Sequence, residues 1–395
     1  MTSSDRITVS KTINTPKVNV VPNTATSNDQ NKTHCKTAAV DNNSTKTLKL
    51  MMISCEENPP YGPSKETAVM FLELLCDAYE KKKCCHSSSS SFVPLSAMCN
   101  EIRELQEQRM TNYNNDNDHV TSFTISITIY HAQRNDYPLT SSEWSSYDGV
   151  IIPGSLSAAY DTHVDWIGKL QSVIRDKIHH MRLKTLGVCF GHQCFAHAFG
   201  TNTESSSSGG DEVGGRAIKC PSGSKAGRIS SELTKEGRHL LFNICNDNST
   251  ESSMEMLYTH GDMVQSLPEF AISLGGNANV PIEACAYFSS REDKILFQQQ
   301  LLNPITNNNG SDNNNGDGVK KLQPYAFTFQ AHPEYISTTG FNVNYFNTVQ
   351  AMQARGYISQ QLSEEVCEDA KVNFDRVQED SLNATIAVAT ALDWF

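Results

Sequence analysis

One cysteine in this sequence lies in the local pattern that activates a nucleophile. Residues 187–193 read Gly-Val-Cys-Phe-Gly-His-Gln, after an apolar run and before a helical pattern over 191–199. Two glycines allow a very tight turn from strand to helix, which leaves Cys189 at the apex. The N-terminus of the following helix favours the thiolate, the form of cysteine that attacks a carbonyl carbon. The alternative is an ordinary buried cysteine beside helix-packing glycines; the strand before it and the helix after it favour the nucleophile.

A cysteine nucleophile needs a base, and the base needs a group that orients it. Among 12 histidines, His332 follows an apolar strand pattern and precedes Pro333 and Glu334. In an extended segment, residues i and i+2 project to the same side, so Glu334 can reach the His332 imidazole. Such a carboxylate fixes the tautomer and stabilises the imidazolium. An exposed turn after a strand is the alternative, and pairing with Cys189 favours the catalytic interpretation.

Other candidate residues carry weaker signals. His192 and His197 follow Cys189 on the expected helix; we expect the first at the pocket mouth and the second packed or at the surface. The segment 208–211, Ser-Gly-Gly-Asp, resembles the start of a nucleotide-binding loop. It lacks the preceding strand and trailing serine that such a loop requires, so we do not assign it nucleotide binding.

The elements that must position Cys189 and His332 follow an α/β pattern. Strands are predicted over 47–55, 123–129, 147–155 and 183–188, and helices over 65–79, 164–178 and 191–199. The first strand is almost continuously apolar, as in a parallel sheet covered on both faces, whereas 123–129 alternates and belongs near an edge. This order predicts a three-layer α/β sandwich with a mainly parallel central sheet, flavodoxin-like in layout.

The second half of the chain reads as shorter strands followed by helices. Strands are predicted at GRAIKC, AGRIS, MEMLYTH, IEACAYF, KILFQQQ and YAFTFQ, and residues 339–380 have helical periodicity. The last two strands flank an Asn-rich segment.

Composition predicts one domain rather than two or three. Residues 1–46 are rich in Thr, Ser, Asn and Lys, and we expect them to form a disordered tail. Residues 82–118, in which 98–109 has the pattern of a short polar helix, and residues 303–320 read as low-complexity insertions. The remaining residues of 47–395 suffice for one large domain with a sizeable core.

Charge and cysteine usage exclude several classes of protein. With 32 basic and 44 acidic residues the net charge is −12, which argues against a nucleic-acid partner. No apolar run is long enough for a membrane span, and the N-terminus lacks the apolar core of a secretory signal. We therefore expect a cytoplasmic protein, with organellar targeting by the tail left open. The 12 cysteines show neither a disulfide framework nor a metal-ligand cluster, so no metal is expected.

Three segments together resemble the class I glutamine amidotransferase family. They are DGVIIPGS, GVCFGHQ and AHPEY, supported in order by AGRISSELTKEGRHLLF and LYTHGDMVQSLPEFAISLGG. The resemblance runs from about residue 47 to 355, and the segments 82–118 and 303–320 depart from it as insertions between elements.

This resemblance implies roles for individual residues. Cys189 is expected as nucleophile, with His332 as general base and acid and Glu334 as the orienting acid. The backbone N–H groups of Gly154 and Phe190 are expected to form the oxyanion hole, since a glycine turn on an adjacent strand can place a second donor.

The same resemblance assigns a substrate-binding group. Gln193 and the segment Thr259, His260, Gly261 and Asp262 are expected to hold the amino-acid part of glutamine or a γ-glutamyl group, although a plain turn is the alternative for that segment. Asp161 is expected near the pocket or as a loop cap.

The resulting hypothesis is amide hydrolysis through a thioester, without a metal or organic cofactor. The expected substrate is a small γ-glutamyl compound, as for stand-alone γ-glutamyl peptidases. One alternative is a glutaminase subunit that passes ammonia to a synthetase partner. Another is a non-catalytic binding or regulatory module on the same fold.

Overall fold

The structure is a computed structural model of the 395-residue chain. It describes residues 6–14, 44–85, 120–161, 163–200, 214–242, 252–302 and 322–395.

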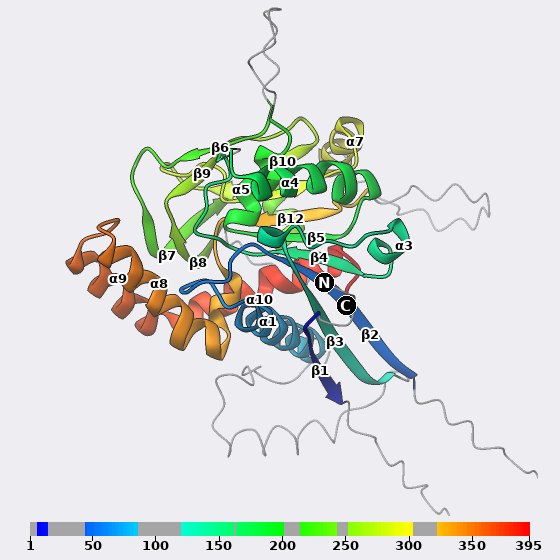
Figure 1. The fold of residues 1–395 in the computed structure, drawn as a ribbon, viewed down its shortest axis with the longest axis horizontal. Coiled ribbons are helices and arrows are strands. Elements are labelled where there is room, and N and C mark those ends of the chain that lie inside the picture. The colour runs from blue at the N-terminus through cyan, green and yellow to red at the C-terminus, as the bar shows by residue number, and fades with distance from the viewer. Residues whose placement is uncertain are drawn as a thin grey trace, which may run out of the picture.

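A ten-stranded sheet runs through the centre of the molecule (Figure 1). Its strands are, in spatial order, β1 (Thr8–Asn14), β3 (Val120–His131), β2 (Ser44–Ser54), β4 (Gly149–Ile152), β5 (Thr185–Val188), β12 (Ala326–Phe329), β11 (Ala284–Tyr287), β10 (Ala271–Gly276), β7 (Lys225–Leu233) and β8 (Ser253–His260). Strands β6 (Arg216–Lys219) and β9 (Asp262–Ser266) form a separate antiparallel pair.

The central part of the sheet is parallel. Strands β3, β2, β4, β5 and β12 pair in parallel, and antiparallel strands extend this block on both sides. Every residue of β4, β5 and β12 is buried, as expected for strands covered on both faces. The predicted α/β class with a mainly parallel, flavodoxin-like centre is confirmed.

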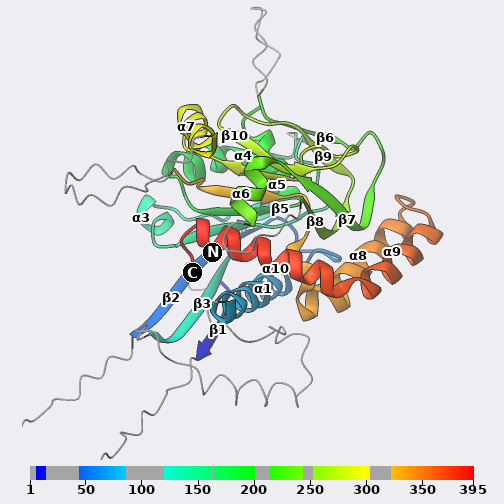
Figure 2. The ribbon, with the colours of Figure 1, turned by 180° about the vertical axis from the view of Figure 1, so that it is seen from behind.

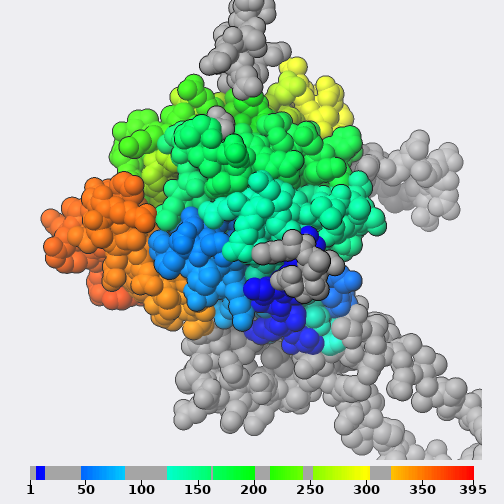
Figure 3. Space-filling model, viewed as in Figure 1, coloured from blue at the N-terminus to red at the C-terminus, as the bar shows by residue number. Residues whose placement is uncertain are grey.

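Helices cover both faces of the sheet (Figures 1 and 2). They are α1 (Ser64–Cys85), α3 (Ser141–Trp144), α4 (Asp165–Val173), α5 (Phe190–His197), α6 (Lys235–Leu241), α7 (Arg291–Leu302), α8 (Phe346–Ala354), α9 (Gln360–Val372) and α10 (Phe374–Ala391). Helices α1, α6, α8 and α10 share one hydrophobic core with the sheet, and α3, α4 and α5 share the second. Helices α8 and α9, orange in Figure 3, form a lobe beside the main body.

The expected disordered tail contains a strand, so the prediction for 1–46 is wrong at Thr8–Asn14. This segment forms β1, which pairs antiparallel with β3 along its whole length. Arg6, just before it, bonds to Asp136 and Glu143 and lies 4.2 Å from the ring centre of Tyr130. These partners are more than a hundred residues away, so composition alone could not reveal the pairing.

Other predictions differ from the structure. KILFQQQ lies within α7 rather than in a strand; Phe297 of that helix is buried and Leu301 packs against the core, whereas Ile295 and Leu296 are exposed. Strands β9 and β10 were not predicted. Helix α1 continues to Cys85, beyond the expected start of the first insertion. The segment 208–211, the short helix at 98–109 and the insertion at 303–320 lie outside the described residues.

The described ranges contain neither a membrane-spanning helix nor a cluster of metal ligands. No helix in them is long and apolar enough to cross a bilayer. Those ranges also hold no group of three or more His, Cys, Asp or Glu residues arranged to bind a metal ion.

A buried carboxyl group links the antiparallel strands. Glu283 is 1% exposed and hydrogen-bonds Ser231 of β7, Tyr258 of β8 and, at 2.9 Å, Asn277. Burial raises the pKa of Glu283 from 4.5 to about 7, against the opposing effect of these hydrogen bonds. The acid therefore stays protonated in the folded protein at a pH where the unfolded chain has released the proton.

We predict that Glu283→Gln changes the pH dependence of stability. An acid with a raised pKa costs stability as pH rises from 4.5 to about 7, because the unfolded chain ionises first. Above this pH window the buried acid lowers the free energy of unfolding by up to about 3 kcal/mol. The neutral amide of Glu283→Gln does not titrate and removes this loss. Urea unfolding on both sides of this window should show the variant gaining stability relative to wild type on the alkaline side. Parallel pH curves for the two proteins would contradict the assignment.

Candidate active site

Three neighbouring strand ends build the candidate site. Strand β5 lies between β4 and β12, with Ile152 paired to Gly187 and Phe329 paired to Val188. Because the three strands are parallel, the segments that follow them emerge at the same edge of the sheet. Gly154, Cys189 and His332 lie on these three segments, which brings together residues from three separate parts of the chain.

The turn at Cys189 has the geometry expected of a nucleophile elbow. Cys189 has φ 52° and ψ −106°, a conformation that a side chain other than glycine rarely adopts. Its N–H donates to the Phe329 carbonyl at 2.8 Å, which anchors the turn to β12. A Cβ at Gly191 would lie 2.1 Å from the Ile152 carbonyl oxygen, so only glycine permits this close approach of α5 to β4. The strain at Cys189 is thus maintained by packing on both sides.

The imidazole of His332 is buried and oriented by a carboxylate. Nδ1 of His332 lies 2.8 Å from Oε1 of Glu334, and the two side chains are 1% and 3% exposed. Pro333 begins a short turn, Pro333–Ile336, that holds Glu334 against the ring. Nε2 of His332 is buried and has no hydrogen-bond partner among the described residues. The arrangement leaves one ring nitrogen for chemistry and assigns the other to Glu334.

Electrostatics favours the protonated form of His332. Burial lowers its pKa, but the charges of Glu334 and Cys189 outweigh burial and raise the pKa of His332 to about 10. A neighbouring imidazolium attracts the negative sulfur that a thiolate nucleophile requires. Glu334 thus favours a positively charged ring beside Cys189.

The expected oxyanion donors lie next to this pair. Phe190 is the first residue of α5, so its N–H belongs to the first turn, which lacks intrahelical acceptors. A Cβ built on Gly154 would lie 3.1 Å from Cε1 of His332 and 3.6 Å from Cβ of Cys189. Gly154 thus borders the side chains of both Cys189 and His332.

The predicted substrate-binding residues gather beside His332. Nδ1 of His260 donates to the Asp262 carbonyl at 2.8 Å, and its buried Nε2 has no partner among the described residues. Burial lowers the pKa of His260 to about 4, with the charge of His332 as a smaller contributor. His260 is therefore neutral, and because Nδ1 carries the proton, Nε2 is a hydrogen-bond acceptor. The Gly261 carbonyl accepts from Cys220 N–H at 2.9 Å and so belongs to the supporting backbone.

Gln193 and Asp262 are both anchored. Nε2 of Gln193 donates to the Asp262 carbonyl and to Oε1 of Gln330, both at 3.1 Å. The Asp262 carboxylate accepts from the Tyr160 hydroxyl at 2.8 Å, and burial raises the pKa of Asp262. Asp161 lies close enough to add to that rise, and its N–H donates to the Ala158 carbonyl within a turn.

One histidine lies elsewhere than expected. His192 is fully buried rather than at the pocket mouth: Nδ1 bonds the Thr328 hydroxyl at 2.8 Å, and Nε2 bonds the Ile282 carbonyl at 3.3 Å. Burial lowers the pKa of His192 to about 3. His192 lies in the first turn of α5, which packs against β12. His197 accepts from the Ala217 N–H and is packed.

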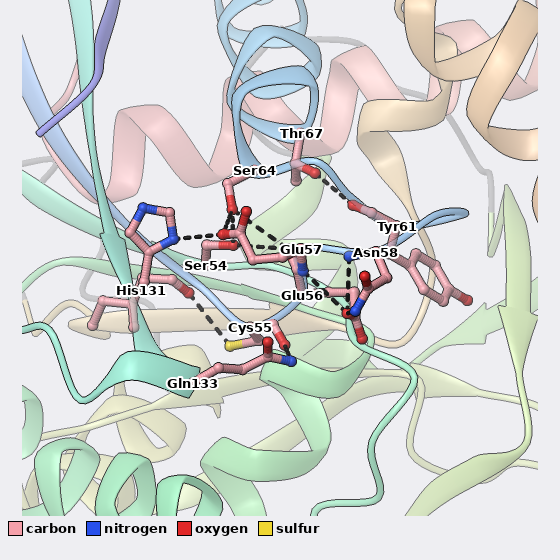
Figure 4. Close-up of polar contacts among 11 residues, drawn as sticks. Ser54, Cys55, Glu56, Glu57, Asn58, Tyr61, Ser64, Thr67, His131 and Gln133 are labelled. Carbon is pink, nitrogen blue, oxygen red and sulfur yellow. Dashed lines mark hydrogen bonds and ion pairs between the residues drawn. The ribbon is translucent and has the colours of Figure 1, made fainter.

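Sequence reasoning missed the loop between β2 and α1. Figure 4 shows Glu56, Asn58 and Tyr61 on this loop. The Glu56 carboxylate accepts from the backbone N–H groups of Glu57 and Asn58, at 3.0 and 3.1 Å, and from Leu156 N–H at 3.4 Å. The loop is therefore tied to the turn that carries Gly154. The only sequence signal was an apolar strand followed by ENPPYGP, which marks a loop but not its partners.

Comparison with known proteins identifies the family that this site resembles. The family model described as glutamine amidotransferase class-I matches residues 113–294, which include Gly154, Cys189 and His260 and end before His332. The resemblance inferred from the sequence is thereby confirmed.

Individual relatives agree with this match. Gamma-glutamyl peptidase 5 of Arabidopsis thaliana is 32% identical over 141 residues, which cover 36% of this chain and 49% of that protein. Gamma-glutamyl peptidase 3 of the same plant is 33% identical over 137 residues, 35% of this chain and 48% of that protein. The chain thus spans about half the length of these relatives. A solved glutamine amidotransferase from Thermotoga maritima aligns with a TM-score of 0.47 at 10% identity, covering 88% of this chain and 98% of that chain.

We predict that Cys189 is alkylated before the fully buried thiols at mildly acidic pH. Burial raises the pKa values of Cys55, Cys194 and Cys285, whereas Cys189 faces the His332 imidazolium. Limited reaction with iodoacetamide followed by peptide mapping measures the order of labelling. His332→Asn should slow the labelling of Cys189 and leave the other three thiols unchanged. Preferential labelling of Cys194 would argue against the elbow.

We also predict that Gly154→Ala damages the site without unfolding the protein. The added methyl group would press on Cε1 of His332 at 3.1 Å, so the imidazole must move. A displacement of a catalytic group by as little as about 1 Å can cost about 100-fold in rate. Turnover and alkylation of Cys189 should both fall while the unfolding midpoint changes little. Ser157→Ala on the same turn is the control, and equal losses in the two variants would contradict the prediction.

Proposed function

Since residues 113–294 match the class I glutamine amidotransferases, we propose that this chain is a cysteine hydrolase that cleaves the γ-glutamyl amide of glutamine or a γ-glutamyl peptide. One observation carries the proposal: Cys189, at the strained apex before α5, faces a buried His332 that Glu334 orients at 2.8 Å. An ordinary buried cysteine needs neither the strained backbone nor an ion-paired histidine beside it.

The first half of the reaction forms a thioester. The Cys189 thiolate attacks the γ-carbonyl carbon, and the carbonyl oxygen takes up the negative charge. The N–H groups of Gly154 and Phe190 donate to this oxyanion. The C–N bond then breaks, and the imidazolium of His332 gives its proton to the leaving amine. This leaves a glutamyl thioester on Cys189 and a neutral His332.

The second half releases glutamate. Neutral His332 removes a proton from water, and the resulting hydroxide attacks the thioester carbonyl. The C–S bond breaks and returns the thiolate, while His332 is again protonated. Glu334 keeps Nδ1 of His332 in the donating tautomer and stabilises the imidazolium in both halves. The cycle consumes one water molecule and needs no other group.

Recognition of the substrate's amino-acid end falls to the His260 region. Nε2 of His260 is a buried acceptor without a partner, and Nε2 of Gln330 is a buried donor without a partner among the described residues. The α-amino and α-carboxylate groups of a γ-glutamyl substrate offer the complementary donor and acceptor. The Asp262 carboxylate adds negative charge for the ammonium. Gln193 contributes by holding Gln330 and the Asp262 carbonyl in place.

We predict that Cys189→Ala abolishes turnover and that Glu334→Gln lowers kcat by orders of magnitude. The amide keeps the shape of Glu334 but loses the charge that stabilises the imidazolium; the analogous change in a serine protease costs about 10⁴-fold. KM should change little, because Glu334 lies behind His332. Release of glutamate from glutamine, glutathione and γ-glutamyl dipeptides by the purified chain measures both effects. Cys367→Ala, a half-buried thiol on α9, is the matched control.

The outcomes of this survey separate the alternatives. Activity of the purified chain alone supports the stand-alone hydrolase. If the chain is inert until cell extract is added, a glutaminase that serves a synthetase partner replaces it. If it stays inert and a glutamine-like chloroketone does not label Cys189, a non-catalytic module on this fold replaces both.

A further inference from the structure

The imidazole of His332 packs parallel to two tyrosine rings. Tyr335 stacks on one face, with ring centres 4.3 Å apart and planes 8° from parallel. Tyr61 also stacks, with ring centres 5.7 Å apart and planes 14° from parallel. Tyr335 is only three residues away in the chain, but Tyr61 comes from the loop between β2 and α1. A distant segment of the chain therefore contributes one wall of the histidine site.

Both tyrosine hydroxyl groups bond the same residue. The Tyr61 hydroxyl donates to the Thr259 carbonyl at 2.8 Å and lies 3.2 Å from the Thr259 hydroxyl. The Tyr335 hydroxyl lies 3.1 Å from that same hydroxyl. Thr259 is 1% exposed at the end of β8, so it is a rigid anchor. The two rings are held at a fixed separation by this shared residue rather than by contact with His332 alone.

The backbone behind Tyr61 is also fixed. The Thr67 hydroxyl on the first turn of α1 donates to the Tyr61 carbonyl at 2.7 Å. Further back, the Glu56 carboxylate accepts from the Asn58 N–H within the loop (Figure 4). It also accepts from the Leu156 N–H, on the turn that carries Gly154. A Cβ on Gly154 would lie 3.7 Å from Cδ1 of Tyr61, so the ring also packs against that turn. The loop thus contacts the base and the expected oxyanion turn at once.

Glu334 cannot hold the imidazole by itself. Its hydrogen bond fixes Nδ1 but leaves the ring free to tilt about that bond, and tilting would move Nε2 away from the Cys189 sulfur. Terminal torsions of histidine have broad minima, so intrinsic rotamer preference does not prevent this. Two tyrosine rings packed parallel to the imidazole oppose such a tilt. Electron-rich phenol faces also attract the imidazolium.

We propose that Tyr61 is a positioning residue for His332, acting with Tyr335 to hold the imidazole plane so that Nε2 faces Cys189. The proposal rests on the proposed function, in which His332 transfers the proton. Tyr61 is the informative member of the pair, since it is only partly buried whereas Tyr335 lies in the core. Its hydroxyl anchors the ring, and its face positions the histidine.

Kinetics of two variants test the two parts of Tyr61 separately. Tyr61→Leu removes the stacking face and should lower kcat by about 10-fold or more, with KM changed by less than about 3-fold. Tyr61→Phe keeps the face and should stay within about 3-fold of wild type in both constants. Tyr357→Leu, an exposed tyrosine between α8 and α9, is the control for loss of a tyrosine elsewhere. Equal kcat in wild type and Tyr61→Leu would overturn the proposal.

Nuclear magnetic resonance gives a readout that does not depend on turnover. In protein labelled with carbon-13 at histidine Cε1, the His332 signal is assigned by its loss in His332→Asn. Ring currents from two stacked tyrosines should shift its Hε1 upfield of exposed histidines. Tyr61→Leu should remove part of this shift and Tyr61→Phe should retain it. An unchanged His332 signal in Tyr61→Leu overturns the proposal.

The same spectra keep the proposal testable if a variant misfolds or the enzyme is inert. Nuclear Overhauser contacts between His332 Hε1 and the Tyr61 ring are measured in the wild-type protein, and their absence overturns the proposal. If wild type hydrolyses no γ-glutamyl compound while these contacts and the ring-current shift are present, the proposed function fails and the positioning of His332 by Tyr61 stands.

Discussion

The parallel pairing of β5 with β4 on one side and β12 on the other is the constraint on which the site depends. With Val188 paired to Phe329, Cys189 follows the end of one strand as His332 follows the end of the next. Gly154 reaches the same edge because Ile152 pairs with Gly187. A shift of one residue in either register would turn the side chains of the shifted strand to the opposite face of the sheet. The proposed chemistry therefore depends on the backbone pairing of these three strands.

Three histidines of this region share deep burial but differ in the partner of Nδ1, and that partner decides the direction of the pKa shift. His192, His260 and His332 are all buried, and burial alone favours the neutral ring in each. Only His332 has a carboxylate on Nδ1, and only its pKa is raised. His260 and His192 bond neutral partners through Nδ1, and their pKa values are lowered. A single carboxylate thus distinguishes the ring with a raised pKa from two neutral hydrogen-bonding rings in the same core.

The loop between β2 and α1 contacts parts of the site that are distant from one another in the sequence. Glu56 contacts the turn of Gly154, and Tyr61 contacts both His332 and the Thr259 backbone. The hydrogen bonds and ring contacts of this short loop therefore hold the separate parts of the site in position.

Local patterns in the sequence determined the elements and the chemically capable residues. Apolar runs predicted β2, β4, β5 and β12, and the glycine spacing around Cys189 predicted a strand-to-helix turn, since such signals depend on neighbours a few residues apart. Partners distant in sequence were decided only by the tertiary structure. The segment Thr8–Asn14 forms a strand by pairing with the edge of β3. The segment KILFQQQ, predicted as a strand, is part of helix α7, and Phe297 is its buried residue. The stacking of Tyr61 on His332 has no local signature in the sequence, because 271 residues separate the two rings. They meet only in the folded chain, where the loop after β2 packs beside the end of β8.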